Sequence, residues 1–163
     1  MAYVSLDSDQ IKKAHKKHKY TKEQVEKLEK CMHPKSGPLF FMKEFMKIQH
    51  PVKGSIPFVP YPYQERLIES YNDHRFSIAM LPRQTGKTTC ASGFLIWYAM
   101  FRPDSQILIA AHKYAGASDI MSRVRYAYEM LPSWIKAGVT QYNRNSIEFD
   151  NGSKIMDGVC HLH

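Results

Sequence analysis

The sequence predicts an α/β fold in which a parallel sheet is flanked by helices and preceded by a small helical segment. From residue 63 onward, short apolar runs typical of buried strands alternate with longer stretches of helical periodicity. Before residue 63, helical spacing gives way to a stretch rich in proline and glycine. We therefore divide the 163-residue chain into a lysine-rich helical segment (1–50), a linker (51–62) and an α/β domain (63–163).

Two helices are predicted in the N-terminal segment. Thr21 and Gln24 have the spacing of a capping box, and apolar residues then recur on one face as far as Met32. Proline and glycine interrupt the pattern over 34–38, and residues 39–48 then form an amphipathic stretch with large apolar side chains. We expect this stretch to dock on the core of the following domain.

The α/β domain is predicted to alternate helices with strands, in the order helix Tyr63–Asn72, buried strand Phe76–Leu81, helix Lys87–Phe101, buried strand Gln106–Ala111 and helix Tyr114–Leu131. Two runs of alternating polarity follow. Asn151–Gly152 between these runs, Ser146–Asp150 and Lys154–Asp157, predicts a hairpin.

The net charge of +8 is concentrated before residue 60. Residues 1–60 hold twelve lysines and six acidic residues, whereas residues 61–163 hold eleven basic and nine acidic residues. The run IKKAHKKHK (11–19) could contact nucleic acid or an acidic partner protein, because clustered cations displace counterions from phosphates. It could equally be a solvated helix face.

Composition also excludes several classes of protein. The longest apolar run, Phe94–Phe101, has eight residues, where a membrane-spanning helix needs roughly 20. The N-terminus lacks the features of a secretory signal, so we expect a cytoplasmic protein. The three cysteines, Cys31, Cys90 and Cys160, are widely spaced and are expected to be free thiols without metal-ligand spacing.

Residues 82–89 (PRQTGKTT) carry the Gly-Lys-Thr core of a phosphate-binding loop between a predicted strand and a predicted helix. In such a loop, backbone N–H groups and the positive end of the helix dipole hold phosphate oxygens. We expect Gly86 to let the chain approach the phosphates, Lys87 to bridge the β- and γ-phosphates, and the Thr88 hydroxyl to ligate Mg²⁺. Leu81 stands where the general pattern has its first glycine, so the pattern is incomplete.

This variant loop resembles that of the terminase large subunits of tailed bacteriophages, the DNA-packaging motors. In that family the first glycine is commonly absent and an arginine stands early in the loop. The segments YPYQE (61–65), AAHK (110–113) and SIEFDNGSKI (146–155) resemble further parts of the family. The resemblance covers roughly residues 39–157.

The resemblance implies a P-loop NTPase domain that uses ATP and Mg²⁺. In the full-length protein it implies ATP-driven translocation of double-stranded viral DNA into the procapsid. It further implies the portal protein and the small terminase subunit as partners, a homo-oligomeric ring, and the host cytoplasm as the location. The residues that would contact the nucleotide are Tyr63, Gln64, Pro82, Arg83, Gln84, Thr85, Gly86, Lys87, Thr88 and Thr89.

The resemblance also implies individual roles. Gln64 would hydrogen-bond the adenine edge, and Tyr63 or a nearby aromatic residue would pack on the ring, although Tyr63 could instead be a core residue. Arg83, with Lys87, would act in catalysis by stabilising charge on the γ-phosphate, the alternative being a loop arginine that pairs with a surface acid. Replacing Arg83 by alanine should lower the rate of the chemical step more than the affinity for ATP.

Four basic residues beyond the second predicted strand have weaker interpretations. His112 and Lys113 could sense DNA or nucleotide, or could cap the next helix. Arg123 and Arg125 are interpreted as surface charge, because residues two apart do not share a helix face.

The family's acidic Walker B pair, coupling segment and nuclease domain have no counterpart in this sequence. Asp150 and Asp157 flank the predicted hairpin, so neither is assigned to metal binding. We therefore expect a chain truncated by an intron, a frameshift or a contig end. Alone it is expected to be inactive and incompletely stable, because its buried strands would lack partner strands. The alternatives are a helicase-like P-loop ATPase and a non-catalytic fragment that interacts with the parent motor.

Overall fold

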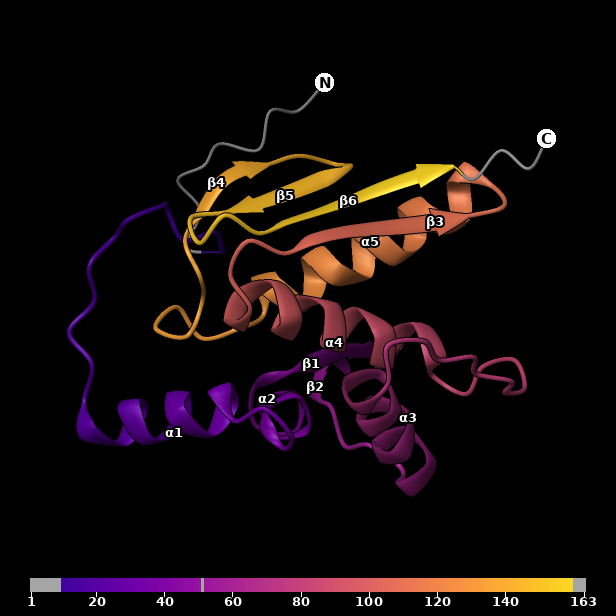
Figure 1. Ribbon diagram of the computed structural model, residues 1–163, viewed down its shortest axis with the longest axis horizontal. Helices are drawn as coiled ribbons and strands as arrows, with labels where there is room; N and C mark the ends of the chain where they lie inside the picture. Colours follow the sequence, from indigo (N-terminus) through magenta and orange to yellow (C-terminus); the bar gives the residue numbers. More distant parts are fainter. Residues whose placement is uncertain (1–9, 51, 160–163) are drawn as a thin grey trace.

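The computed structural model of the protein describes residues 10–50 and 52–159. Its elements are α1 (Lys22–Met32), α2 (Gly37–Phe45), β1 (Lys47–His50), β2 (Gly54–Pro57), α3 (Pro62–Asp73), α4 (Lys87–Phe101), β3 (Gln106–Ala111), α5 (Tyr114–Glu129), β4 (Val139–Tyr142), β5 (Ser146–Phe149) and β6 (Lys154–Val159). In Figure 1, the sheet β3–β6 forms one layer, α4 and α5 lie on one side of it, and the N-terminal elements form a third layer beyond α4.

The main sheet is mixed, with strand order β3-β6-β5-β4. Among the described strands, β3 and β6 run parallel, whereas β5 pairs antiparallel with both β6 and β4. The fold is therefore mixed α/β, and the expectation of a parallel sheet holds for one pair of strands alone. The hairpin predicted at Asn151–Gly152 is confirmed, since it joins β5 to β6.

Helix α4 forms the centre of the hydrophobic core. Buried residues occur all round it, as expected of a helix covered on several sides. It contacts α2 and α3 on one side and α5 on the other. Trp97 of α4 is fully buried and its indole Nε1–H donates to the carbonyl oxygen of Cys31 at 2.8 Å. This bond ties the end of α1 to the core.

The predicted helical stretch after residue 38 does dock on the core. Phe41, Met42 and Phe45 of α2 are buried, and α2 contacts α4. The predicted capping box of α1 is also confirmed. Thr21 Oγ1 accepts from Gln24 N at 3.3 Å, and Gln24 Oε1 accepts from Thr21 N at 3.0 Å.

Two stretches of the N-terminal segment and linker differ from the sequence-based expectation. Lys47–His50, expected to be helical, and Gly54–Pro57, expected to be an extended linker, form the antiparallel hairpin β1–β2. Residues 11–19 are not helical. Residues 12–15 lie beside β4 instead, where Val139 N donates to Lys12 O and His15 N donates to Asp150 Oδ2.

The expectation of a buried strand over Phe76–Leu81 is wrong. The segment pairs with no strand in the described part of the chain, and Phe76, Ile78 and Met80 are 80%, 94% and 92% exposed. Its apolar residues predicted burial, but a strand also requires a partner strand for its backbone groups. Among the described strands β3 pairs with β6 alone, so it is an edge strand, and Leu108 on it is 64% exposed.

Within the described ranges, no helix is long and apolar enough to span a membrane.

Candidate functional site

The loop predicted to bind phosphate, residues 82–86, joins segment 74–81, which is exposed over residues 74–80, to the start of α4. Figure 1 shows this loop at the end of the molecule where β3 and β6 terminate. This is the carboxyl edge of the parallel pair, the edge at which α/β proteins commonly bind ligands.

The backbone of the loop turns twice through the left-handed region. Gln84 has φ of 62° and Gly86, the N-cap of α4, has φ of 77°. A Cβ atom at residue 86 would lie 2.5 Å from Gln64 Nε2. Both the conformation and the contact therefore favour glycine at this position.

The N-terminus of α4 is electropositive. No side chain caps it, its first turn has no acidic residue, and Lys87 is the first helical residue. The first N–H groups of a helix have no partner within the helix, and the helix dipole adds a partial positive charge there. A lysine at this position is unfavourable next to the positive end of the helix dipole, so it does not stabilise the helix. Its presence is better explained by the binding of an anion.

Lys87 and Thr85 hold the loop in its conformation. Lys87 Nζ donates to the carbonyl oxygens of Leu81 at 2.9 Å and Pro82 at 2.6 Å. Thr85 Oγ1 also donates to Pro82 O, at 3.0 Å. The ammonium group of Lys87 is thus fixed over the start of the loop.

Tyr63 and Gln64, on the first turn of α3, contact the same loop. Tyr63 Oη and Gln64 Nε2 both donate to the carbonyl oxygen of Thr85, at 2.9 and 3.0 Å. Gln64 is buried, and its Oε1 accepts from Tyr61 N at 2.9 Å. The structure therefore brings the two residues of the YPYQE segment to the loop, 21 and 22 residues away in sequence. One N–H of the Gln64 amide remains for a further acceptor.

Sequence reasoning missed the part played by Tyr61. Its ring stacks on that of Tyr63, with centroids 5.8 Å apart and an interplanar angle of 6°. Tyr61 is also the N-cap of α3, where its backbone N–H is satisfied by Gln64. Tyr61 directly precedes Pro62 and stands three residues before Gln64, at the start of a helical pattern, and this spacing was the signal available in the sequence.

The remaining loop residues differ in exposure. Arg83 and Gln84 are exposed, and Arg83 forms no ion pair within residues 10–50 and 52–159. The alternative in which Arg83 pairs with a surface acid is therefore not what is observed. Thr88 is half-buried and its carbonyl oxygen accepts from Ser92 Oγ at 2.8 Å. Thr89 lines a cleft between α4 and α5.

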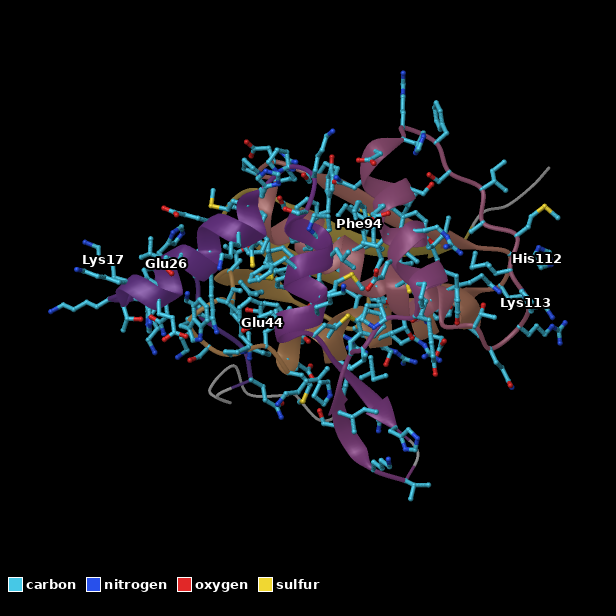
Figure 2. The ribbon with its side chains drawn as sticks, turned by 90° about the horizontal axis from the view of Figure 1, so that it is seen from below. Lys17, Glu26, Glu44, Phe94, His112 and Lys113 are labelled. Atoms are coloured by element: carbon cyan, nitrogen blue, oxygen red, sulfur yellow. The ribbon has the colours of Figure 1, made fainter. Side chains whose placement is uncertain are left out.

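His112 and Lys113 are both exposed and follow β3. Lys113 is the N-cap of α5, where its carbonyl oxygen accepts from Gly116 N at 2.9 Å. Figure 2 shows both side chains at the same end of the molecule as the segment that precedes α4. They therefore occupy the end that carries the loop.

Four other residues considered from the sequence lie away from the loop. Arg123 is exposed and pairs with Asp119 at 3.1 Å, as expected of surface charge, whereas Arg125 has a buried Nε without a hydrogen bond. Asp150 accepts a hydrogen bond from His15 N, and both carboxylate oxygens of Asp157 are buried without a partner among the residues that the structure describes. We assign none of them to the site.

Cys31 and Cys90 are free and fully buried, and burial raises the pKa of their thiols to about 12 and about 11. Neither thiol is therefore a nucleophile near neutral pH. Cys160, His161 and His163 lie outside the described residues. Among those that are described, no three His, Cys, Asp or Glu side chains form a cluster that could hold a metal ion.

The fold and the site define a mixed α/β protein with a glycine-lysine-threonine loop at the N-terminus of its central helix. Residues 78–158, about half of the chain, match the family described as terminase large subunit, T4-like virus type, N-terminal. The chain belongs to this family of bacteriophage DNA-packaging proteins. The match begins just before the loop and ends in β6, so it includes the loop, α4, β3, α5 and the β5–β6 hairpin.

Proposed function

We propose that this chain binds ATP with Mg²⁺ at residues 82–89 and forms the ATPase portion of a DNA-packaging terminase. The observation that carries the proposal is the uncapped, electropositive start of α4, where Gly86 and Lys87 follow a loop that turns twice through the left-handed region. Family membership supports it, because the match includes this loop.

The residues present have the chemistry that a magnesium-bound triphosphate requires. The backbone N–H groups of the first turn of α4 and the Lys87 ammonium would hold phosphate oxygens. The Thr88 hydroxyl is a hard oxygen ligand suited to Mg²⁺. When bound, the ion neutralises charge on the phosphates and polarises the bond to be broken.

Lys87 would exchange its two carbonyl acceptors for phosphate oxygens, since it already lies over the loop. Arg83 is exposed and unpaired within the described part of the chain, so its guanidinium is free to stabilise charge that develops on the γ-phosphate. Tyr63 and Gln64 would contact the base from the first turn of α3, because both already reach Thr85.

Double-stranded DNA is the second partner that we propose, with ATP hydrolysis driving its movement in the assembled motor. The exposed lysines of the basic N-terminal segment (residues 11–19) are the surface we propose for phosphate contacts. Figure 2 places Lys17 at the end of the molecule opposite His112 and Lys113, so this surface is separate from the loop.

The test of the loop is ATP binding by the purified chain, measured by calorimetry in the presence of Mg²⁺. Lys87→Ala should weaken binding at least about tenfold, because charge-assisted hydrogen bonds to phosphate are lost. Arg83→Ala should change the affinity by no more than about threefold, since a contact made in the transition state contributes little to ground-state binding.

Lys113→Ala is a matched control, because it removes one positive charge from the same end of the molecule. Circular dichroism of each variant checks the fold. The proposal fails if ATP does not bind, or if Lys87→Ala and Lys113→Ala weaken binding to the same extent.

A further inference from the structure

The cleft that Thr89 lines has a volume of about 560 Å³ and lies between β1, α4 and α5. Of the proposed nucleotide site (82–89), Thr89 lines the cleft and residues 82–88 do not, so the cleft adjoins the site and lies mainly outside it. Its volume is within the range of clefts that hold small molecules, roughly 300–1,000 Å³.

Cationic side chains without a full set of partners line this cleft. The Lys47 side chain on β1 forms no hydrogen bond or ion pair within the described ranges. Arg123 on α5 uses its Nε–H for Asp119 at 3.1 Å, which leaves its terminal N–H groups available. Asp119 is the one carboxylate of the lining, and this contact offsets its charge.

Neutral donors complete the lining. His50 Nδ1 accepts from the backbone N–H groups of Val52 and Lys53, at 3.2 and 3.1 Å, so the ring proton lies on Nε2. Thr89, Ser122 and Tyr126, each of which has a hydroxyl group, line the cleft from α4 and α5. Residues with hydrogen-bond donors therefore line the cleft from three elements.

We infer that this cleft binds the phosphate group of a small phosphorylated molecule. Two cations against one carboxylate make the lining net positive, which favours an anion. A phosphate has acceptor oxygens on all sides and suits donors that come from several directions, whereas a carboxylate presents its two oxygens in one plane. The inference concerns a second anion site and does not depend on ATP binding at the loop.

The cleft is close to the first turn of α4. Thr89, which lines it, follows Thr88, and Ser92, also in the lining, donates to Thr88 O at 2.8 Å. A ligand in the cleft would therefore act on the helical turn that carries the phosphate-binding loop. Occupancy of one site is expected to change the affinity of the other.

The test uses inorganic pyrophosphate as the probe and a Lys87→Ala chain, so that the lysine of the loop does not contribute. Calorimetry at constant ionic strength should give saturable binding of one pyrophosphate per chain. Adding Lys47→Gln or Arg123→Gln should each weaken binding about tenfold. Lys53→Gln is the matched control, because Lys53 lies in the same hairpin but does not line the cleft.

A second measurement does not depend on any variant. In the unsubstituted chain, a pyrophosphate titration followed by amide NMR should shift the signals of residues 47–50 and 122–126. The inference is overturned if the Lys87→Ala chain shows no saturable binding, if the three Gln variants bind equally, or if only signals of residues 82–89 shift.

Discussion

Gly86 is a residue at which both backbone conformation and packing disfavour a larger side chain. Its φ of 77° is unfavourable for residues with a Cβ, and that atom would lie 2.5 Å from Gln64 Nε2. Gln64 cannot easily move away, because its amide is hydrogen-bonded to Tyr61 N and Thr85 O. The glycine of the loop thus has a structural role in addition to the proposed approach of phosphate.

Replacing Gly86 by alanine should lower the free energy of unfolding by about 2–3 kcal/mol, the backbone strain and the steric clash being added together. Gly54→Ala is the matched control. Gly54 has a similar φ of 70°, but no atom of the described residues lies within 4 Å of the place that an alanine methyl group would occupy, so we expect only the backbone strain of about 1 kcal/mol. Urea unfolding of both variants measures the difference. Equal losses would show that the contact with Gln64 contributes nothing.

At the residue scale, the sequence allowed the loop to be located but not its internal contacts. Gly86, Lys87 and Thr88 are consecutive, so this motif could be recognised in the sequence. The bonds from Tyr63 and Gln64 to Thr85 cross more than 20 residues, and the acceptors of Lys87 are backbone carbonyls. A backbone acceptor has no residue-type signal, so no sequence pattern indicates it.

At the scale of the elements, helices were predicted more accurately than strands. The predicted bounds of α4 and β3 agree with the structure, and those of α3 and α5 differ by one or two residues at their ends. The hydrogen bonds of a helix join residues close in sequence, so apolar periodicity and capping residues contain most of the information needed to predict its position. A strand depends on its partner, which explains why Phe76–Leu81 was wrongly predicted and why the hairpin β1–β2 was missed.

The exposed segment 76–80 is expected to limit the solubility of the chain. Phe76, Ile78 and Met80 are at least 80% exposed, and their backbone is unpaired in the described part of the chain. An extended apolar segment of this kind promotes association between chains. Ile78→Lys should therefore reduce aggregation, measured by light scattering at increasing protein concentration, and leave the melting temperature almost unchanged.

Ile109→Lys provides the contrast for that experiment. Ile109 of β3 is buried, so a lysine at this place would leave a charge in the core and should unfold the protein. Aggregation of the Ile78→Lys variant at the same concentration as the original chain would show that another surface is responsible.

At the scale of the whole molecule, the basic N-terminal segment and the loop are at opposite ends. Figure 2 shows Lys17 at one end and His112 and Lys113 at the other. Part of the segment has a structural role, since Lys12 Nζ donates to Lys136 O at 2.8 Å and Lys13 pairs with Val139. Within residues 10–19, the exposed lysines without such contacts are Lys16, Lys17 and Lys19.

These three lysines should contribute to the salt dependence of binding to double-stranded DNA. Each lysine–phosphate contact adds roughly 0.9 to the slope of log K against log salt concentration, so replacing all three by glutamine should reduce the slope by up to about 2.7. Fluorescence anisotropy of a labelled duplex at several salt concentrations measures this slope.

The matched control replaces Lys27, Lys43 and Lys154 by glutamine. This triple variant loses the same charge, but from lysines that are paired with Glu44, Glu65 and Glu148. Because those carboxylates already compensate them, the control should change the slope by less than about 1. If both triple variants reduce the slope equally, DNA responds to net charge alone and the basic N-terminal segment is not its contact surface.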